Sequence, residues 1–330
     1  MYESYYGLSA KPFQLKPDPH FFFGSKGHKR AMAYLEYGLS QGEGFIVITG
    51  EVGAGKTTLV RNLFENMKSE KIIAAHIVNT HLDAEDTLRT VAAAFGLPYE
   101  NVSKTTLLTG IEQFLRQCEQ QGKRALLVVD EAQNLSSRTV EELRMLSNFQ
   151  TAEKSLLQTF LLGQPEFRKT LHSRDMQQLR QRVIATYHLG PMDAAETRAY
   201  IEHRLHTVGW SGDPSLSEDA FAAIHEYSNG IPRKINTLCD RLFLMGYLED
   251  LHSFGKTEVD EVNKDIQQEF YLPNSEENIG SANDIPPIEL GDTRADVENM
   301  MERISRMERS FIFMLDLVRQ TLAKFKDTSK

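Results

Sequence analysis

Short apolar runs alternate with amphipathic stretches over the first 190 residues of the chain. The run 45–49 is apolar and β-branched, which is typical of a buried strand. Four similar runs predict strands at 71–78, 124–130, 155–163 and 182–190. Apolar residues at helical spacing predict helices at 26–41, 57–67, 84–96, 105–122 and 140–150. Apolar strands separated by helices indicate an α/β fold with a parallel sheet covered on both faces, and we expect 182–190 at its edge.

The pattern becomes helical after Pro191. Apolar periodicity predicts helices at 193–208, 217–228, 232–249 and 257–268. Residues 273–296 then hold six acidic residues and one basic residue among Pro, Gly, Ser and Asn, which predicts an acidic disordered linker. The chain therefore divides into four predicted parts, which are 1–190, 191–272, 273–296 and 297–330.

The last part, 297–330, has apolar residues at alternating spacings of four and three, interrupted at Glu308. This spacing predicts an amphipathic, coiled-coil-like helix. Three roles stay open for it: association with itself or a partner, docking on the body of the protein, or contact with a membrane through the apolar stretch 311–315.

Composition restricts the compartment and the partners. The 330 residues carry a net charge of −9, so nucleic acid is not an expected partner. Cys118 and Cys239 are expected to be buried free thiols. The N-terminus has no signal-peptide pattern, and no run approaches the roughly 18 apolar residues of a transmembrane segment. We therefore expect a cytoplasmic protein, with peripheral attachment to the inner membrane through a partner as the alternative.

The sequence GEVGAGKT at 50–57 follows the first strand and opens a helix, and it fits the P-loop pattern at every fixed position. The glycines let the backbone wrap a phosphate, Lys56 reaches the β- and γ-phosphates, and the Thr57 hydroxyl ligates Mg²⁺. ATP and Mg²⁺ are therefore the expected ligands. The predicted nucleotide-binding residues are Gly50, Glu51, Val52, Gly53, Ala54, Gly55, Lys56, Thr57, Thr58 and Asp130.

Two further segments bear on this nucleotide site. Residues 1–30 are rich in aromatic residues and proline, and they either lie against the nucleotide base or cover an edge of the core. The strand 124–130 places Asp130 at its carboxyl end, where it would hold Mg²⁺ together with Thr57, and Glu131 would accept a proton from the attacking water. The alternative for this acidic pair is a strand that simply ends in two solvated acids.

Four more polar residues are candidates for the chemistry. Gln164 follows the strand 155–163 at the same sheet edge and would hydrogen-bond the γ-phosphate or the water. Arg180 and Arg182 precede the edge strand, and one of them would reach the nucleotide of a neighbouring subunit. Arg233 begins a helix of the second part and would fold onto the phosphates. For each arginine the alternative is a solvated surface residue.

The sequences GEVGAGKTTL, LLVVDEAQNL, LLGQPEF, LRQRV and GIPRKIN, in this order, resemble those of AAA+ ATPases of the ExeA type. The opening MYESYYGLSAKPFQLKPDPHFFFGS is similar to that of the exosortase-associated (XrtA/PEP-CTERM) secretion ATPases, which accompany exopolysaccharide loci. The resemblance covers about residues 1–270, and it implies an αβα ATPase core, a helical lid, ATP hydrolysis and assembly into a ring or partial ring. By this resemblance the catalytic residues are Lys56 of Walker A, Glu131 of Walker B, Gln164 as sensor 1, Arg182 as arginine finger and Arg233 as sensor 2.

The chain also departs from the ExeA pattern. ExeA resembles a longer protein with a membrane span and a peptidoglycan-binding module, so cell-wall binding is not carried over. Gln164 stands where Asn or Thr is more usual. The same core resembles DNA-transposition ATPases, so the resemblance alone does not identify the partner.

Three functions compete at this point. The first is an ATP-driven switch or motor in envelope secretion or exopolysaccharide assembly, working as a homo-oligomer with a membrane-bound partner. The second is a DNA-binding AAA+ regulator of the transposition type, against which the acidic linker counts. The third is a nucleotide-gated scaffold with little turnover, against which the intact pair Asp130 and Glu131 counts.

Overall fold

The computed structural model describes residues 1–66, 72–78, 83–152 and 154–270, which belong to one compact unit. The linker expected at 273–296 and the helix expected at 297–330 lie outside the described residues. The expected α/β architecture is confirmed for the part that the structure describes.

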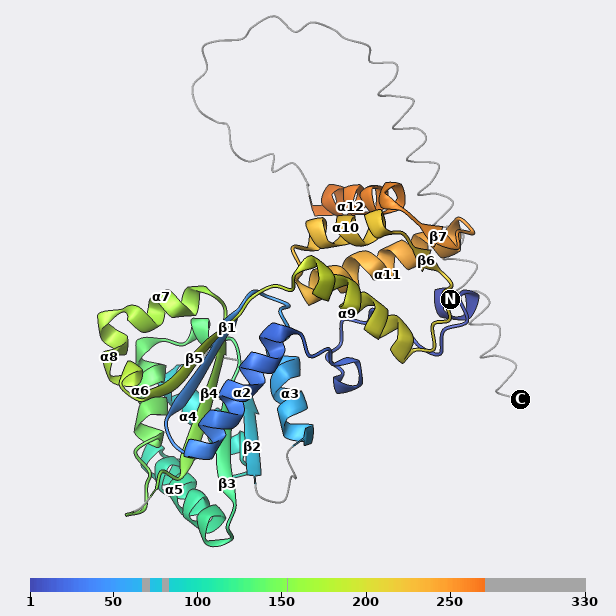
Figure 1. Cartoon of the computed structure of the whole chain (residues 1–330). Helices are drawn as coiled ribbons and strands as arrows, with labels where there is room; N and C mark the ends of the chain where they lie inside the picture. The colour runs from blue at the N-terminus through green and yellow to red at the C-terminus, as the bar shows by residue number, and fades with distance from the viewer. Residues whose placement is uncertain (67–71, 79–82, 153, 271–330) are drawn as a thin grey trace, which may run out of the picture. The chain divides into compact units, whose positions relative to one another are not determined.

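A five-stranded parallel sheet forms the centre of the first part of the chain (Figure 1). The strand order is β2-β3-β4-β1-β5, which confirms β5 as an edge strand. Each predicted strand is confirmed to within two residues at either end. The strands are β1 Phe45–Gly50, β2 Ile72–Ile77, β3 Arg124–Val129, β4 Leu157–Gly163 and β5 Val183–Leu189. Because the strands are parallel, the carboxyl ends of β1, β3 and β4 meet at one edge of the sheet.

Helices cover both faces of this sheet (Figure 1). Along β1, Phe45 and Val47 pack in the cluster that contains α4 to α7, whereas Ile46 and Ile48 pack with α2 and α3. This alternation is the side-chain period of a strand that is buried on both faces. The helices are α2 Lys26–Gln41, α3 Lys56–Asn66, α4 Ala84–Ala94, α5 Lys104–Gln120, α6 Ser137–Leu146, α7 Glu166–His172 and α8 Gln177–Arg180.

Some helix boundaries differ from the prediction. The helix expected at 140–150 spans Ser137–Leu146 instead, because the Ser136 hydroxyl caps its first turn by accepting the Thr139 N–H at 3.1 Å. Helices α7 and α8 were not predicted, since they are too short to show an apolar period. Cys118 and Cys239 are buried and free, as expected.

The second part of the chain packs four helices around its own apolar cluster. The helices are α9 Ala194–Thr207, α10 Glu218–Ser228, α11 Pro232–Leu248 and α12 Lys256–Phe270, with the short helix α1 Tyr2–Tyr5 packed on α11. The expectation of helices alone was wrong here, because β6 Ser215–Leu216 pairs in parallel with β7 Ser253–Phe254. Strands of two residues are too short to show alternation.

The N-terminal strap, defined as residues 1–25, contributes aromatic residues to this second cluster. The rings of Tyr2, Tyr6 and Phe13 meet Phe243 of α11 edge-on, with centroids 6.1, 5.6 and 5.4 Å apart. Such edge-to-face pairs add to the free energy gained by burying the rings. The first residues therefore pack with the helical part, whereas the division of the sequence at residue 190 had placed them with the sheet.

Candidate nucleotide site

The P-loop, residues 50–57, joins the end of β1 to the start of α3. Gly53 and Gly55 have φ angles of +83° and +94°, which glycine adopts without strain. A Cβ atom at Gly53 would lie 2.3 Å from Cβ of Arg233, and one at Gly55 would lie 2.8 Å from Nε2 of His28. Both positions therefore require glycine, for the backbone conformation and for the close contacts.

Lys56 is buried under the loop, with 8% of its surface exposed. Its Nζ donates to the backbone carbonyls of Gly50 and Glu51, at 2.7 and 3.0 Å. Burial lowers the pKa of Lys56, and the negative charges of Asp130, Glu131 and Glu51 oppose this shift. The loop thus holds a cation beside the backbone that would wrap a phosphate.

Asp130 and Thr57 form a contact that suits a magnesium ion. Thr57 Oγ1 donates to Asp130 Oδ2 at 2.7 Å, and Nε2 of His76 on β2 lies 3.8 Å from the same oxygen. Burial raises the pKa of Asp130, but the contact with His76 and the hydrogen bonds from Thr57 and the backbone N–H of Glu131 outweigh it and lower the pKa. An ionised carboxylate next to a hydroxyl is an oxygen donor set that Mg²⁺ accepts together with phosphate oxygens, so these residues fit the ion.

Glu131 follows Asp130 in the left-handed backbone region, with φ of 53°. Its Oε2 accepts hydrogen bonds from Nε2 of Gln133 at 2.5 Å and from Nε2 of Gln164 at 3.2 Å. Oε1 of Gln133 accepts the backbone N–H of Gln164 at 3.0 Å. The structure therefore brings the predicted residues Glu131 and Gln164 together. Gln133 was missed, although it stands in the same motif, two residues after Glu131.

Arg233 lies beside the P-loop, in the first turn of α11. Its backbone N–H donates to the carbonyl of Gly53 at 3.2 Å, and Pro232 occupies the preceding helical position. The positive end of the α11 dipole and the guanidinium are thus both available to an anion at the loop. The role expected of Arg233 stays a prediction.

Arg182 and Arg180 do not line the same cavity as the P-loop. The backbone carbonyl of Arg182 accepts the N–H of Phe45, which places Arg182 at the amino end of β1, opposite the P-loop. Its guanidinium donates to Ser147 Oγ at 2.8 Å and to Asn148 Oδ1. Arg180 donates to the carbonyl of Leu171 at 2.9 Å. Neither arginine can therefore serve the P-loop of its own chain in this arrangement.

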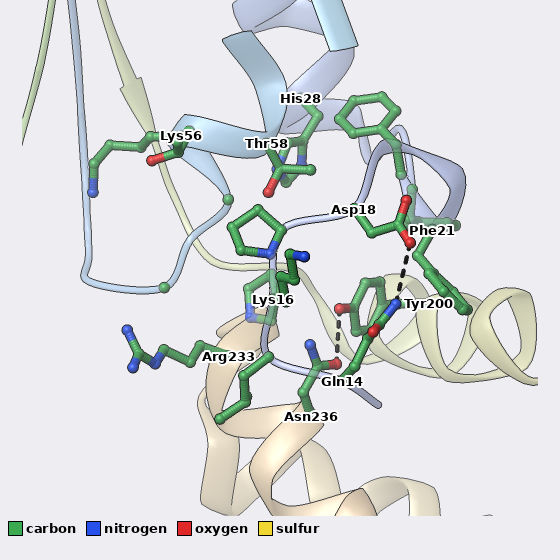
Figure 2. A pocket seen from close by; sticks show the side chains of 18 of the residues that line it. Gln14, Lys16, Asp18, Phe21, His28, Lys56, Thr58, Tyr200, Arg233 and Asn236 are labelled. Carbon is green, nitrogen blue, oxygen red and sulfur yellow. Dashed lines mark hydrogen bonds between the residues drawn. The ribbon is translucent and has the colours of Figure 1, made fainter. Parts of the chain in front are cut away.

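A cavity of about 210 Å³ extends from the P-loop to the strap and the second part of the chain. Figure 2 shows Lys56 and Thr58 on one side, Tyr200, Arg233 and Asn236 on the other, and Gln14 and Asp18 of the strap beside them. The strap contributes to both a core and the cavity, since Tyr6 and Phe13 fill an apolar core and residues 14–18 and 21–23 line this cavity. The predicted residues that line the cavity are Val52, Gly53, Gly55, Lys56, Thr57, Thr58, Asp130, Glu131 and Arg233. The other predicted loop residues contribute carbonyls instead, at Gly50, Glu51 and Ala54.

His28 is a further site residue that sequence reasoning missed. It is 6% exposed, its Nε2 lies 3.1 Å from the Ala54 carbonyl, and its Nδ1 lies 2.7 Å from Ser25 Oγ. Burial lowers the pKa of His28, which favours the neutral ring. The ring links α2 to the P-loop. A contact across 26 residues leaves no signal in a local pattern.

A parallel sheet in this strand order, a P-loop after β1, an acidic pair after β3 and a helical second part define the P-loop fold of the AAA+ ATPases. Residues 39–171 match the AAA domain family. Solved structures of other proteins share the fold, among them a Cdc6p and an ORC2 protein. Cdc6p of Pyrobaculum aerophilum is 16% identical with a TM-score of 0.61, covering 77% of this chain and 70% of that one. The ORC2 protein of Aeropyrum pernix is 15% identical with a TM-score of 0.60, covering 78% and 71%.

The chain is also similar in sequence to a protein of a secretion pathway. The chain is 40% identical over 253 residues to general secretion pathway protein A of Aeromonas hydrophila. The match covers 76% of this chain and 46% of that protein, so the chain spans less than half the length of its relative. These similarities support the interpretation of the chain as an AAA ATPase of the ExeA type. Among the described residues, no helix is long and apolar enough to cross a membrane.

Proposed function

We propose that this chain is a Mg²⁺-dependent ATPase that acts as a switch or motor in envelope secretion. The observation that carries the proposal is the partly buried contact between Thr57 and Asp130, with Lys56 in the adjoining loop and Glu131 next in sequence. Phosphoryl transfer needs positioned charge more than it needs covalent chemistry, and this edge of the sheet supplies both signs of charge.

Each residue has a defined part in this proposal. The P-loop amides and Lys56 bind the phosphates of ATP, and Thr57 and Asp130 hold Mg²⁺. The ion would neutralise charge on the β- and γ-phosphates. Glu131 accepts a proton from the attacking water, and Gln164 orients that water or the γ-phosphate. Arg233 responds to the phosphates from the lid, which we take as residues 191–272.

The assembly and the pathway are the finer parts of the proposal. Arg182 lies at the amino end of β1, on the opposite side of the sheet from its own P-loop. This position supports a role on the nucleotide of a neighbouring subunit in a ring or partial ring. The identity to a secretion protein supports a membrane-bound partner and peripheral attachment at the inner membrane. A role in exopolysaccharide assembly within the XrtA/PEP-CTERM subfamily rests on the N-terminal sequence alone.

The test is steady-state ATP hydrolysis by the wild type and by Glu131→Gln, with Mg²⁺ or with excess EDTA. The wild type should turn over only with Mg²⁺, and Glu131→Gln should still bind ATP but turn over at least about a hundredfold more slowly, because the proton acceptor is lost. Normal turnover in the variant would refute Glu131 as the base. Strong stimulation by duplex DNA would favour the transposition-type regulator over the secretion ATPase.

A further inference from the structure

Arg204 of α9 is buried at the wall of the nucleotide cavity, with 6% of its surface exposed. Its Nε and Nη2 donate to the strap carbonyls of Pro12 and Gln14, and its Nη1 donates to the hydroxyl of Tyr200 at 2.8 Å. Within the described ranges, no salt bridge involves Arg204. A guanidinium has only donors, so every one of these hydrogen bonds runs outward from Arg204.

This outward donation determines the direction of the next hydrogen bond. The Tyr200 oxygen accepts from Arg204, and burial raises the pKa of Tyr200, so the hydroxyl keeps its proton. Tyr200 donates that proton to Oδ1 of Asn236 at 2.8 Å. Because the amide oxygen is directed at Tyr200, the amide nitrogen is turned to the other side, as Figure 2 shows. No hydrogen bond to another described residue engages this nitrogen.

We propose that Asn236 donates this N–H to a ring nitrogen of adenine in the bound nucleotide, and that Tyr200 and Arg204 are positioning residues that orient the donor. The inference rests on the proposed ATP site. Asn236 is 6% exposed and lines the cavity. It follows Arg233 by three residues on α11, so both side chains share one helix face. One face of α11 then serves the phosphates at its first turn and the base one turn later.

Adenine fits a donor of fixed direction because its ring nitrogens N1, N3 and N7 all carry lone pairs. Guanine carries a proton on N1, but its N3 and N7 still accept, so this donor distinguishes the two bases only where it faces N1. The lining of the cavity also includes apolar residues, among them Pro17 and Phe22 from the strap and Met192 from the start of the second part. Apolar walls with a few directed polar groups are the usual construction of a small-molecule site.

The experiment compares ATP with tripolyphosphate, which carries the phosphates without the base, by isothermal titration calorimetry in Mg²⁺. Asn236→Leu keeps the branching at Cγ and the neutral charge but removes the donor. We expect its Kd for ATP to rise about tenfold and its Kd for tripolyphosphate to stay within about twofold of the wild-type value. Asn263→Leu on α12, outside the cavity, is the matched control and should change neither Kd.

A second variant tests the orientation. Tyr200→Phe leaves Asn236 in place but releases its oxygen, so the Kd for ATP should rise about threefold, with tripolyphosphate again unchanged. An unchanged affinity of Asn236→Leu for ATP would overturn the inference, as would an equal loss for both ligands. A wild type that bound neither ligand would refute the proposed ATP site itself, whereas a selective loss of ATP separates the base contact from phosphate binding.

Discussion

At the scale of single residues, the carboxylate of Glu131 is restrained by two amide groups. Gln133 and Gln164 both donate to its Oε2, and Gln133 also accepts the backbone N–H of Gln164. Gln133 therefore ties the proposed base after β3 to the end of β4. Turning Glu131 towards a different partner requires breaking its two hydrogen bonds, each worth about 1.5–3 kcal/mol for a charged acceptor.

Replacing Gln133 tests this restraint. Gln133→Leu should lower kcat about tenfold and leave the KM for ATP nearly unchanged, because the proposed base loses its orientation while the phosphate site stays intact. The measurement is steady-state hydrolysis over a range of ATP concentrations. Gln178→Leu, at an exposed position of α8, is the control and should behave as the wild type. A Gln133→Leu enzyme with full kcat would show that this amide does not position Glu131.

At the scale of elements, the P-loop and α11 meet without a side chain between them. The Gly53 carbonyl accepts the Arg233 N–H, and a Cβ at Gly53 would overlap the Arg233 side chain. The backbones of the P-loop and of the lid helix α11 are therefore in direct contact. Any side chain at Gly53 would push Arg233 away from the phosphates.

Gly53→Ala measures the cost of that displacement, and Gly209→Ala is a close control. Both glycines have φ of 83°, but a Cβ at Gly209 would meet nothing within 4 Å. Both variants should lose about 1 kcal/mol of stability through backbone strain. Only Gly53→Ala should also lose ATP affinity, by about tenfold or more, in calorimetric titration. Equal ATP affinities in the two variants would argue against the contact between loop and lid.

The strands and the longer helices were predictable from the sequence, and so were the positions of the residues that follow directly after the strands. The strands around the P-loop are apolar on both faces, so their runs mark them and place Asp130 and Gln164 at one edge. His28 and Asn236 could not be predicted, and Gln133 was missed although it stands in the motif of Glu131. Their roles come from hydrogen bonds to the loop, the β4 end and α9, and a local pattern does not record such contacts. The pair β6 and β7 was missed because its strands have two residues each.

At the scale of the whole molecule, the two ends of the sheet carry different parts of the proposed chemistry. The P-loop and Asp130 lie at the carboxyl edge, and Arg182 lies at the amino end of β1, bound to Ser147 and Asn148. One chain therefore offers a nucleotide site and an arginine that does not reach it. The proposed ring would join the arginine of one copy to the site of the next.

Complementation between inactive variants tests this arrangement. Arg182→Ala and Lys56→Ala should each lose ATPase activity, since the first lacks the finger and the second lacks the phosphate cation. Mixing them should restore part of the activity, because a Lys56→Ala subunit lends its arginine to an intact site. The measurement is hydrolysis across mixing ratios, with Arg180→Ala as the control that should stay active alone. No recovery at any ratio would contradict a finger that acts between subunits.

The strap also has a consequence for the order in which the chain folds during synthesis. Tyr2 donates to Asp240 and Tyr6 donates to the carbonyl of Leu251, partners that follow 238 and 245 residues later. At about 5–20 residues per second, a ribosome takes roughly 12 to 50 seconds to produce them. During that time the first aromatic residues to emerge have no partner to bury them, while the P-loop sheet already has its own strands. The wall of the nucleotide cavity that the strap builds is therefore completed only after α11 and the residues that follow it to Leu251 have been made.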